Sequence, residues 1–187
     1  MIQIVTADGR KEREVLQAMR ARAAQANEEI DRAVSAIMED VRKNGYQAVA
    51  ACSQKFDGAE PYEIAPERLE AACAACPPEL LSALERAAAN IRDYNEKLLL
   101  KSQEWRSPNG GVVGRIVRGL SRVGIYVPGG TAAYPSSVLM NAVPAKVAGV
   151  GEIIMVTPPT ENLNDAVLAA AKIAGVDRVI AVGGAQA

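Results

Sequence analysis

The chain has 187 residues, of which 49% are hydrophobic, so it can bury a sizeable core in one or two domains. Its formal net charge is −1, and lysine and arginine are spread along the sequence. This pattern excludes a footprint for nucleic acid or a membrane surface, and no apolar run approaches the roughly 20 residues that span a bilayer.

The composition also restricts the chemistry, because the chain contains no histidine. Histidine-dependent nucleophilic catalysis and histidine-ligated metal sites are therefore excluded within these residues. The three cysteines, without a signal-like N-terminus, fit a reducing cytoplasm. Cys73 and Cys76 form a C-x-x-C pair whose helical spacing with Leu69 predicts core positions rather than a metal or redox site. No catalytic residue and no metal ligand is assigned in this chain.

Residues 1–102 are predicted to be mostly helical. Apolar side chains recur with a helical period over residues 30–41 and 49–56, and again over residues 80–98 after a Pro-Pro pair. Pro66 suits the first turn of a further helix. The turn-rich stretch after residue 102 marks a boundary, and residues 103–121 are expected to form a linker with a short β-like segment, for which we considered a hairpin over residues 112–122.

The pattern of apolar residues changes in residues 122–187, where continuous apolar runs of strand length occur at 123–127, 152–157 and 178–182. Helix-like stretches ending in glycine lie between these runs, so the pattern predicts a βαβαβ unit with a parallel sheet. The fold class is therefore α/β, a helical region followed by a Rossmann-like half. Pro144 is expected to kink or divide the first crossover helix. Because no helix follows the third strand, an uncovered sheet face and an open edge are expected.

Special residues follow each predicted strand: Pro128-Gly129-Gly130, Pro158-Pro159 and Gly183-Gly184. The carboxyl ends of parallel strands share one edge of the sheet, where ligands bind. The first glycine pair lacks both the dinucleotide fingerprint and the phosphate-binding loop, so a plain tight turn and a ligand loop both stay open.

The residues around this turn also have two interpretations each. Tyr126 either packs against the sheet or places its ring at the ligand edge, and the pattern does not separate these. Ser136 and Ser137 are predicted to be helix N-caps rather than nucleophiles, because no histidine is present to activate them.

The segment "VGIYVPGGTAAYPSSVLMNAVPAKVAGV" and the later "VGGAQA" closely resemble signature motifs of the L-histidinol dehydrogenase family. "NGYQAVAACSQKFDG" is similar to the helical N-terminal region of that family. The resemblance implies Rossmann-like halves related to aldehyde dehydrogenases and a cytoplasmic, intertwined homodimer. It further implies oxidation of L-histidinol to L-histidine through the aldehyde, the last step of histidine biosynthesis, with two NAD and a zinc ion.

The same resemblance assigns NAD contacts to Tyr126 and Gln186, with weaker assignments for Pro128, Gly129 and Gly130. Family members are more than twice as long, and their zinc ligands and acid–base pair follow the "GGAQA" motif. We therefore expect an N-terminal fragment that carries part of the NAD site and is inactive alone. A truncated, non-catalytic nucleotide-binding or regulatory module and an assembly module are the alternatives.

Overall fold

The computed structural model describes residues 4–5, 7–129, 134–160 and 163–187, with the backbone alone for residues 22–27. Its elements are α1 (Lys11–Asn44), α2 (Tyr46–Asp57), β1 (Tyr62–Ile64), α3 (Pro66–Ala75), α4 (Pro78–Leu98), β2 (Gln103–Arg106), β3 (Val112–Arg115), β4 (Arg122–Tyr126), α5 (Pro135–Val147), β5 (Glu152–Thr157), α6 (Asp165–Ala174) and β6 (Arg178–Ala181). None of the helices in these ranges combines the length and apolarity that a membrane crossing requires.

The central sheet has the strand order β1-β6-β5-β4. Strands β4, β5 and β6 run parallel, which confirms the predicted βαβαβ unit. Strand β1 joins the outer edge of β6 in antiparallel direction, with Tyr62 opposite Ala181. This strand comes from the region expected to be mostly helical, and its three residues are too few to give a periodic signal.

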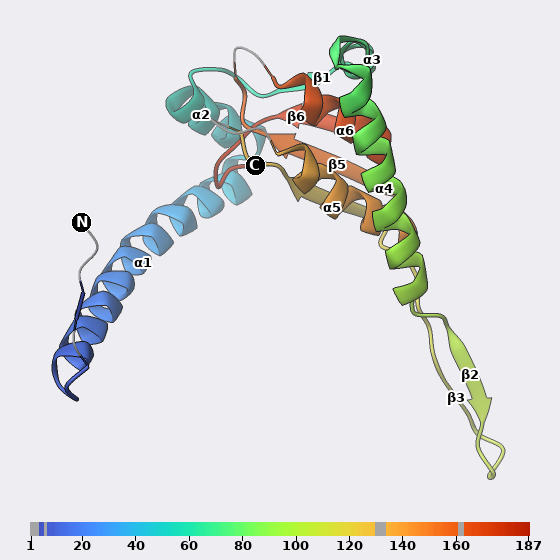
Figure 1. The fold of residues 1–187 in the computed structure, drawn as a ribbon, viewed down its shortest axis with the longest axis horizontal. Coiled ribbons are helices and arrows are strands. Elements are labelled where there is room, and N and C mark those ends of the chain that lie inside the picture. Colours follow the sequence, from blue (N-terminus) through green and yellow to red (C-terminus); the bar gives the residue numbers. More distant parts are fainter. Residues whose placement is uncertain (1–3, 6, 130–133, 161–162) are drawn as a thin grey trace.

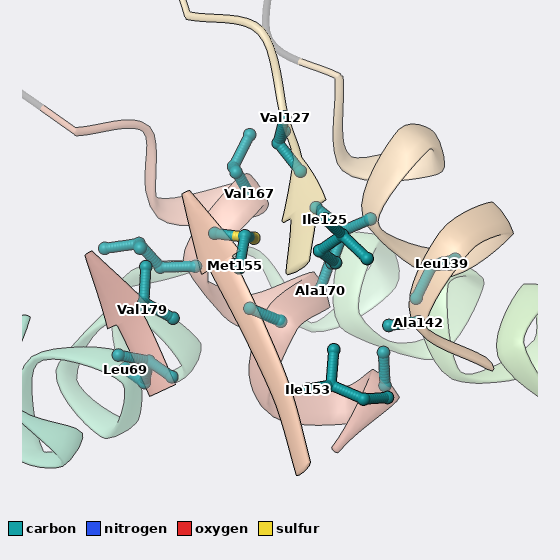
Figure 2. Close-up of a cluster of buried hydrophobic side chains, with 14 of the residues drawn as sticks. Leu69, Ile125, Val127, Leu139, Ala142, Ile153, Met155, Val167, Ala170 and Val179 are labelled. Atoms are coloured by element: carbon teal, nitrogen blue, oxygen red, sulfur yellow. The ribbon is translucent and has the colours of Figure 1, made fainter. Parts of the chain in front are cut away.

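One face of the sheet carries the core (Figure 2). Both crossovers connect neighbouring strands in the same direction, so right-handed connections place α5 and α6 on the same face. Helix α3 packs against α6, and α4 packs against α5. The largest fully buried side chains come from these layers and include Leu139, Ile153, Met155 and Leu168.

The opposite face of the sheet is poorly covered. Gly124 and Tyr126 of β4 are exposed there, and Ile154, Val156 and Ile180 are only half-buried. Strand β4 also leaves its outer edge unpaired within the described sheet. The expected uncovered face is confirmed, but the outer edge of the third parallel strand, β6, is closed by β1, and the open edge lies at β4 instead.

Helix α5 corrects two expectations from the sequence. Pro135 occupies the first helical position, where its fixed φ suits the helix, so Tyr134 stands at the N-cap, and none of the described side chains caps the helix. Ser136 and Ser137 thus lie inside the first turn, and their assignment as N-caps is wrong. Pro144 does not divide the helix, which continues to Val147, although its missing N–H leaves the Met140 carbonyl without the usual i+4 donor.

The cysteine expectation is confirmed for the core position. Cys76 is buried at the end of α3, and Cys73 is half-buried one turn earlier; both are free thiols. Burial raises the pKa of the Cys76 thiol, and the nearby charges of Asp165 and Cys73 raise it further.

Two elements extend away from the sheet (Figure 1). Helix α1 has no fully buried side chain among those described. Strands β2 and β3 form an antiparallel hairpin in which Trp105 lies opposite Val113, and every strand residue is exposed. The hairpin therefore exists, but it is centred on the turn at 107–111 rather than lying within residues 112–122.

Candidate functional site

The candidate site lies where the loops after β4, β5 and β6 meet. The ring of Pro158, directly after β5, stands between the two glycine loops. A Cβ atom added to Gly129 would come within 3.3 Å of the Pro158 ring, and one added to Gly183 would come within 2.7 Å. The predicted convergence of the strand ends is thus confirmed at atomic distance for these residues. At Gly183 the ring leaves no room for a side chain, whereas at Gly129 an added Cβ would be only slightly too close.

Gly184 has a different requirement from that of Gly183. Its φ of +71° lies in the left-handed region, which favours glycine. A Cβ at this position would also come 2.5 Å from Oε1 of Gln186, because the Gln186 side chain folds back over the turn. The "GGAQA" sequence therefore forms a tight turn whose glycines make room for Pro158 on one side and for Gln186 on the other.

Tyr126 connects the first strand end to this turn. Its hydroxyl oxygen accepts a hydrogen bond from the Gly184 N–H at 3.3 Å. The ring stands on the poorly covered face of the sheet and is 46% exposed, so it is open to a stacking ligand. This position matches the interpretation in which the Tyr126 ring lies at the edge of the sheet and not the one in which it packs against the sheet.

Gln186 is the one buried side chain in the described structure whose polar atoms lack hydrogen-bond partners. The residue is only 4% exposed, yet neither Oε1 nor Nε2 has a hydrogen-bond partner among the described residues. A buried amide in this state costs free energy, so its retention needs a reason. A ligand with donor and acceptor groups that reaches this turn would supply the missing partners.

The remaining residues with predicted NAD contacts are Pro128, Gly129 and Gly130. Pro128 and Gly129 are exposed at the end of β4, next to Pro158. The φ of Gly129 is not positive, so this glycine serves close approach rather than an unusual backbone conformation. Gly130 lies outside the described residues.

A buttress of hydrogen bonds around Asp177 ties together the amino ends of β5 and β6, opposite the strand ends that form the candidate site. The Asp177 carboxylate accepts hydrogen bonds from Lys146 Nζ at 2.8 Å and from the Ile153 N–H at 2.7 Å. Lys146, followed by the Ile153 amide, holds the pKa of Asp177 below its usual value. On the far edge of the sheet, Arg178 makes a bidentate pair with Glu63 that ties β1 to β6.

The sequence did not indicate the roles of Pro158 and Asp177. In the sequence, Pro158-Pro159 marks only the end of a strand, and no spacing rule shows that the Pro158 ring meets both glycine loops. Asp177 sits in an ordinary helix-to-strand turn. The signal for this edge is the set of special residues that follow the three predicted strands, and it does not show which loops contact one another.

The described residues contain no group of three or more cysteine, aspartate and glutamate side chains placed to share a metal ion. Together with the lack of histidine in the whole sequence, this means that the described residues do not fit a zinc site. The half-exposed Tyr126 ring and the unpaired Gln186 amide, by contrast, fit a polar organic ligand such as a dinucleotide.

Comparison with known proteins gives a family for this arrangement. The family model described as histidinol dehydrogenase matches residues 20–187. A histidinol dehydrogenase from Clostridium acetobutylicum is 46% identical over 100% of this chain and 44% of its own length. One from Cupriavidus pinatubonensis is 53% identical over 86% of this chain and 38% of its own length.

A solved structure agrees with this family. The crystal structure of histidinol dehydrogenase from Elizabethkingia anophelis superposes with a TM-score of 0.77 at 31% identity, covering 84% of this chain and 37% of that one. The chain spans less than half the length of these relatives. With a family match that extends over most of its residues, the chain belongs to the histidinol dehydrogenase family.

Proposed function

We propose that this chain forms part of the NAD-binding edge of an L-histidinol dehydrogenase, which oxidises L-histidinol to L-histidine through the aldehyde. The observation that carries the proposal is the buried, unpaired amide of Gln186, which lies over the same Gly184 whose N–H donates to the Tyr126 hydroxyl. NAD would supply the hydride acceptor of the reaction. In the proposal, Tyr126, Gln186 and the strand-end glycines hold the dinucleotide.

Each residue has a distinct task in this proposal. The exposed Tyr126 ring offers a face on which a planar group of the cofactor stacks. The Gln186 amide offers one acceptor and two N–H donors to polar groups of the same ligand. Gly129 and Gly183 let their loops pack closely against Pro158, and the poorly covered face leaves room for the ligand.

The metal and the proton chemistry belong to the proposed whole enzyme and not to the described residues. These residues do not fit zinc, so no step is assigned to the metal here. The chain also lacks a histidine that would serve as a base. We therefore propose that the 187-residue chain alone does not turn over L-histidinol, and that the whole enzyme acts in the cytoplasm on L-histidinol, NAD and zinc.

The test is titration of the chain with NAD⁺ by calorimetry, comparing Gln186→Leu with the matched control Gln103→Leu on the exposed hairpin. We expect weak binding with a Kd of about 1 mM, equivalent to about −4 kcal/mol. Gln186→Leu should abolish this binding, while the free energy of unfolding stays level or rises by about 1 kcal/mol because an unpaired buried amide is removed. Gln103→Leu should change neither quantity.

The outcomes separate a binding role from a structural role. Loss of stability without loss of binding would make Gln186 a structural residue and contradict the proposal. No binding of NAD⁺ by the parent chain would remove the claim that this chain carries a usable part of the site. NADH production from L-histidinol by the pure chain would refute the proposed inactivity.

A second proposed role, assembly, is favoured by the exposed apolar side chains of α1 and the hairpin. Leu16 and Met19 on α1, and Trp105 and Ile116 on or next to the hairpin, are all more than half exposed. We propose that these faces contribute to a homodimer. Sedimentation velocity over a range of concentrations tests this role, and a strictly monomeric chain would contradict it for the isolated chain.

A further inference from the structure

The ring of Pro158 contacts both glycine loops of the candidate site from the strand between them. Its Cδ, Cβ and Cγ atoms come within 3.3–3.4 Å of the Cβ position of Gly129. Its Cγ, Cβ and Cα atoms come within 2.7–3.0 Å of the Cβ position of Gly183. Van der Waals contact on two sides leaves the loops little freedom to move toward each other.

The backbone around Pro158 fixes the ring in turn. The carbonyl of Thr157, the preceding residue, accepts a hydrogen bond from the Val182 N–H at 2.8 Å. The Val127 N–H donates to the Val156 carbonyl at 2.9 Å on the other side. The strands on both sides of β5 are therefore pinned one residue before each loop begins, and proline adds a fixed φ and needs no hydrogen-bond partner for its nitrogen.

The contacts continue from the ring to the side chains that the proposed function uses. Gly183 abuts the ring, Gly184 donates to the Tyr126 hydroxyl, and Gln186 folds over Gly184. We infer that Pro158 is a positioning residue, a wedge that sets the spacing between the β4 and β6 loops and so places Tyr126 and Gln186 for the dinucleotide. This inference rests on the proposed function for its ligand.

The first test compares Pro158→Gly with Pro159→Gly, which carries the same gain in chain entropy one residue away. Amide hydrogen exchange is measured across residues 183–186, and NAD⁺ is titrated into each variant well below its unfolding temperature. Pro158→Gly should speed exchange at these amides by about tenfold and raise the Kd for NAD⁺ by about tenfold. Pro159→Gly should change both by less than about twofold.

The second test adds Gly183→Ala to the parent and to Pro158→Gly. In the parent, the new methyl group collides with the ring and should lower the unfolding midpoint by about 4 °C. In the Pro158→Gly background the collision is relieved, so the drop should be about half as large or smaller. Equal drops in both backgrounds would show that the ring does not set the position of this loop.

The results distinguish the wedge from the proposed function. If the parent chain does not bind NAD⁺, the proposed function fails, while the exchange data and the Gly183→Ala coupling still decide the role of Pro158. If Pro158→Gly and Pro159→Gly behave alike in exchange, and Gly183→Ala costs the same with and without the Pro158 ring, the wedge is wrong whatever the chain binds. Binding that is weakened only by Pro158→Gly, with altered exchange, supports both.

Discussion

The sheet with α3–α6, which we call the body, differs sharply from α1 and the β2–β3 hairpin, which we call the arms. The body buries Leu139 and Leu168 almost completely. The arms leave large apolar side chains in the open, Trp105 and Ile116 among them. Both regions have clear apolar patterning, so the pattern predicts an element without showing whether its apolar face is covered within the same chain.

The largest expected effect on stability comes from making the same substitution, leucine to alanine, once in the body and once at an arm. Leu168→Ala in the body should lower the free energy of unfolding by about 2–5 kcal/mol, because it leaves a cavity in a packed core. Leu100→Ala, at the root of the hairpin where Leu100 is 60% exposed, should change it by about 0.5 kcal/mol or less. Urea unfolding followed by circular dichroism measures both. Equal losses would show that the arm is as well packed as the body.

A second substitution tests the junction between the two regions. Gly119 lies where the hairpin rejoins the body, and a Cβ there would overlap the Gly149 carbonyl oxygen and lie 2.8 Å from the Ala148 oxygen. Backbone must move to relieve this, so Gly119→Ala should cost about 1–3 kcal/mol of unfolding free energy. The control is Gly124→Ala in β4, where nothing lies within 4 Å of the added methyl group. If the two variants are equally stable, the junction is looser than the contacts indicate.

The sequence predicted the body well because its signals are local. The apolar runs gave β4, β5 and β6, and the glycine-ended stretches between them gave α5 and α6. The strand ends were correctly expected to converge at one edge. Residues that act over long sequence distances were missed: Pro158 meets loops from two other strands, and β1 pairs with β6 across more than a hundred residues.

The arms show what the apolar pattern of the sequence does not reveal. Helical periodicity over residues 30–41 is confirmed by α1, yet Ile30 is 58% and Met38 is 42% exposed. Periodicity records that one face is apolar, and a second copy or another surface covers such a face as readily as the same chain does. Family resemblance named Tyr126 and Gln186, while the unpaired state of the Gln186 amide required atomic packing.

A smaller effect concerns pH and the buttress of the body. Because the pKa of Asp177 is lowered in the folded chain, its contribution is fully present above the ordinary value of 3.8 and is lost as the pH falls below it. The side chain is 39% exposed, so solvent screening limits the effect to less than about 1 kcal/mol. Asp177→Asn should therefore slightly reduce the free energy of unfolding at about pH 7. It should also make the fall of that free energy in acid less steep than in the parent. Urea unfolding at several pH values measures this, with Asp93→Asn on the surface of α4 as the control. If the free energy of unfolding of Asp177→Asn fell in acid as steeply as that of the parent, the role of Asp177 in the buttress would be contradicted.

The smallest effect on stability sharpens the comparison most directly. Trp105 is the only tryptophan of the chain and is 53% exposed on the hairpin, so its emission reports on the arm alone. Trp105→Ala should change the free energy of unfolding by about 0.5 kcal/mol or less, measured by circular dichroism.

In the parent, the Trp105 emission in dilute solution should be that of a water-exposed indole. It should shift to shorter wavelength as the protein concentration rises, because self-association covers the arm. A shift that follows sedimentation mass would tie the arm to the proposed homodimer. Emission that is already blue-shifted in a dilute monomer would mean that the arm folds back on its own chain, and the contrast between body and arms would then disappear in solution.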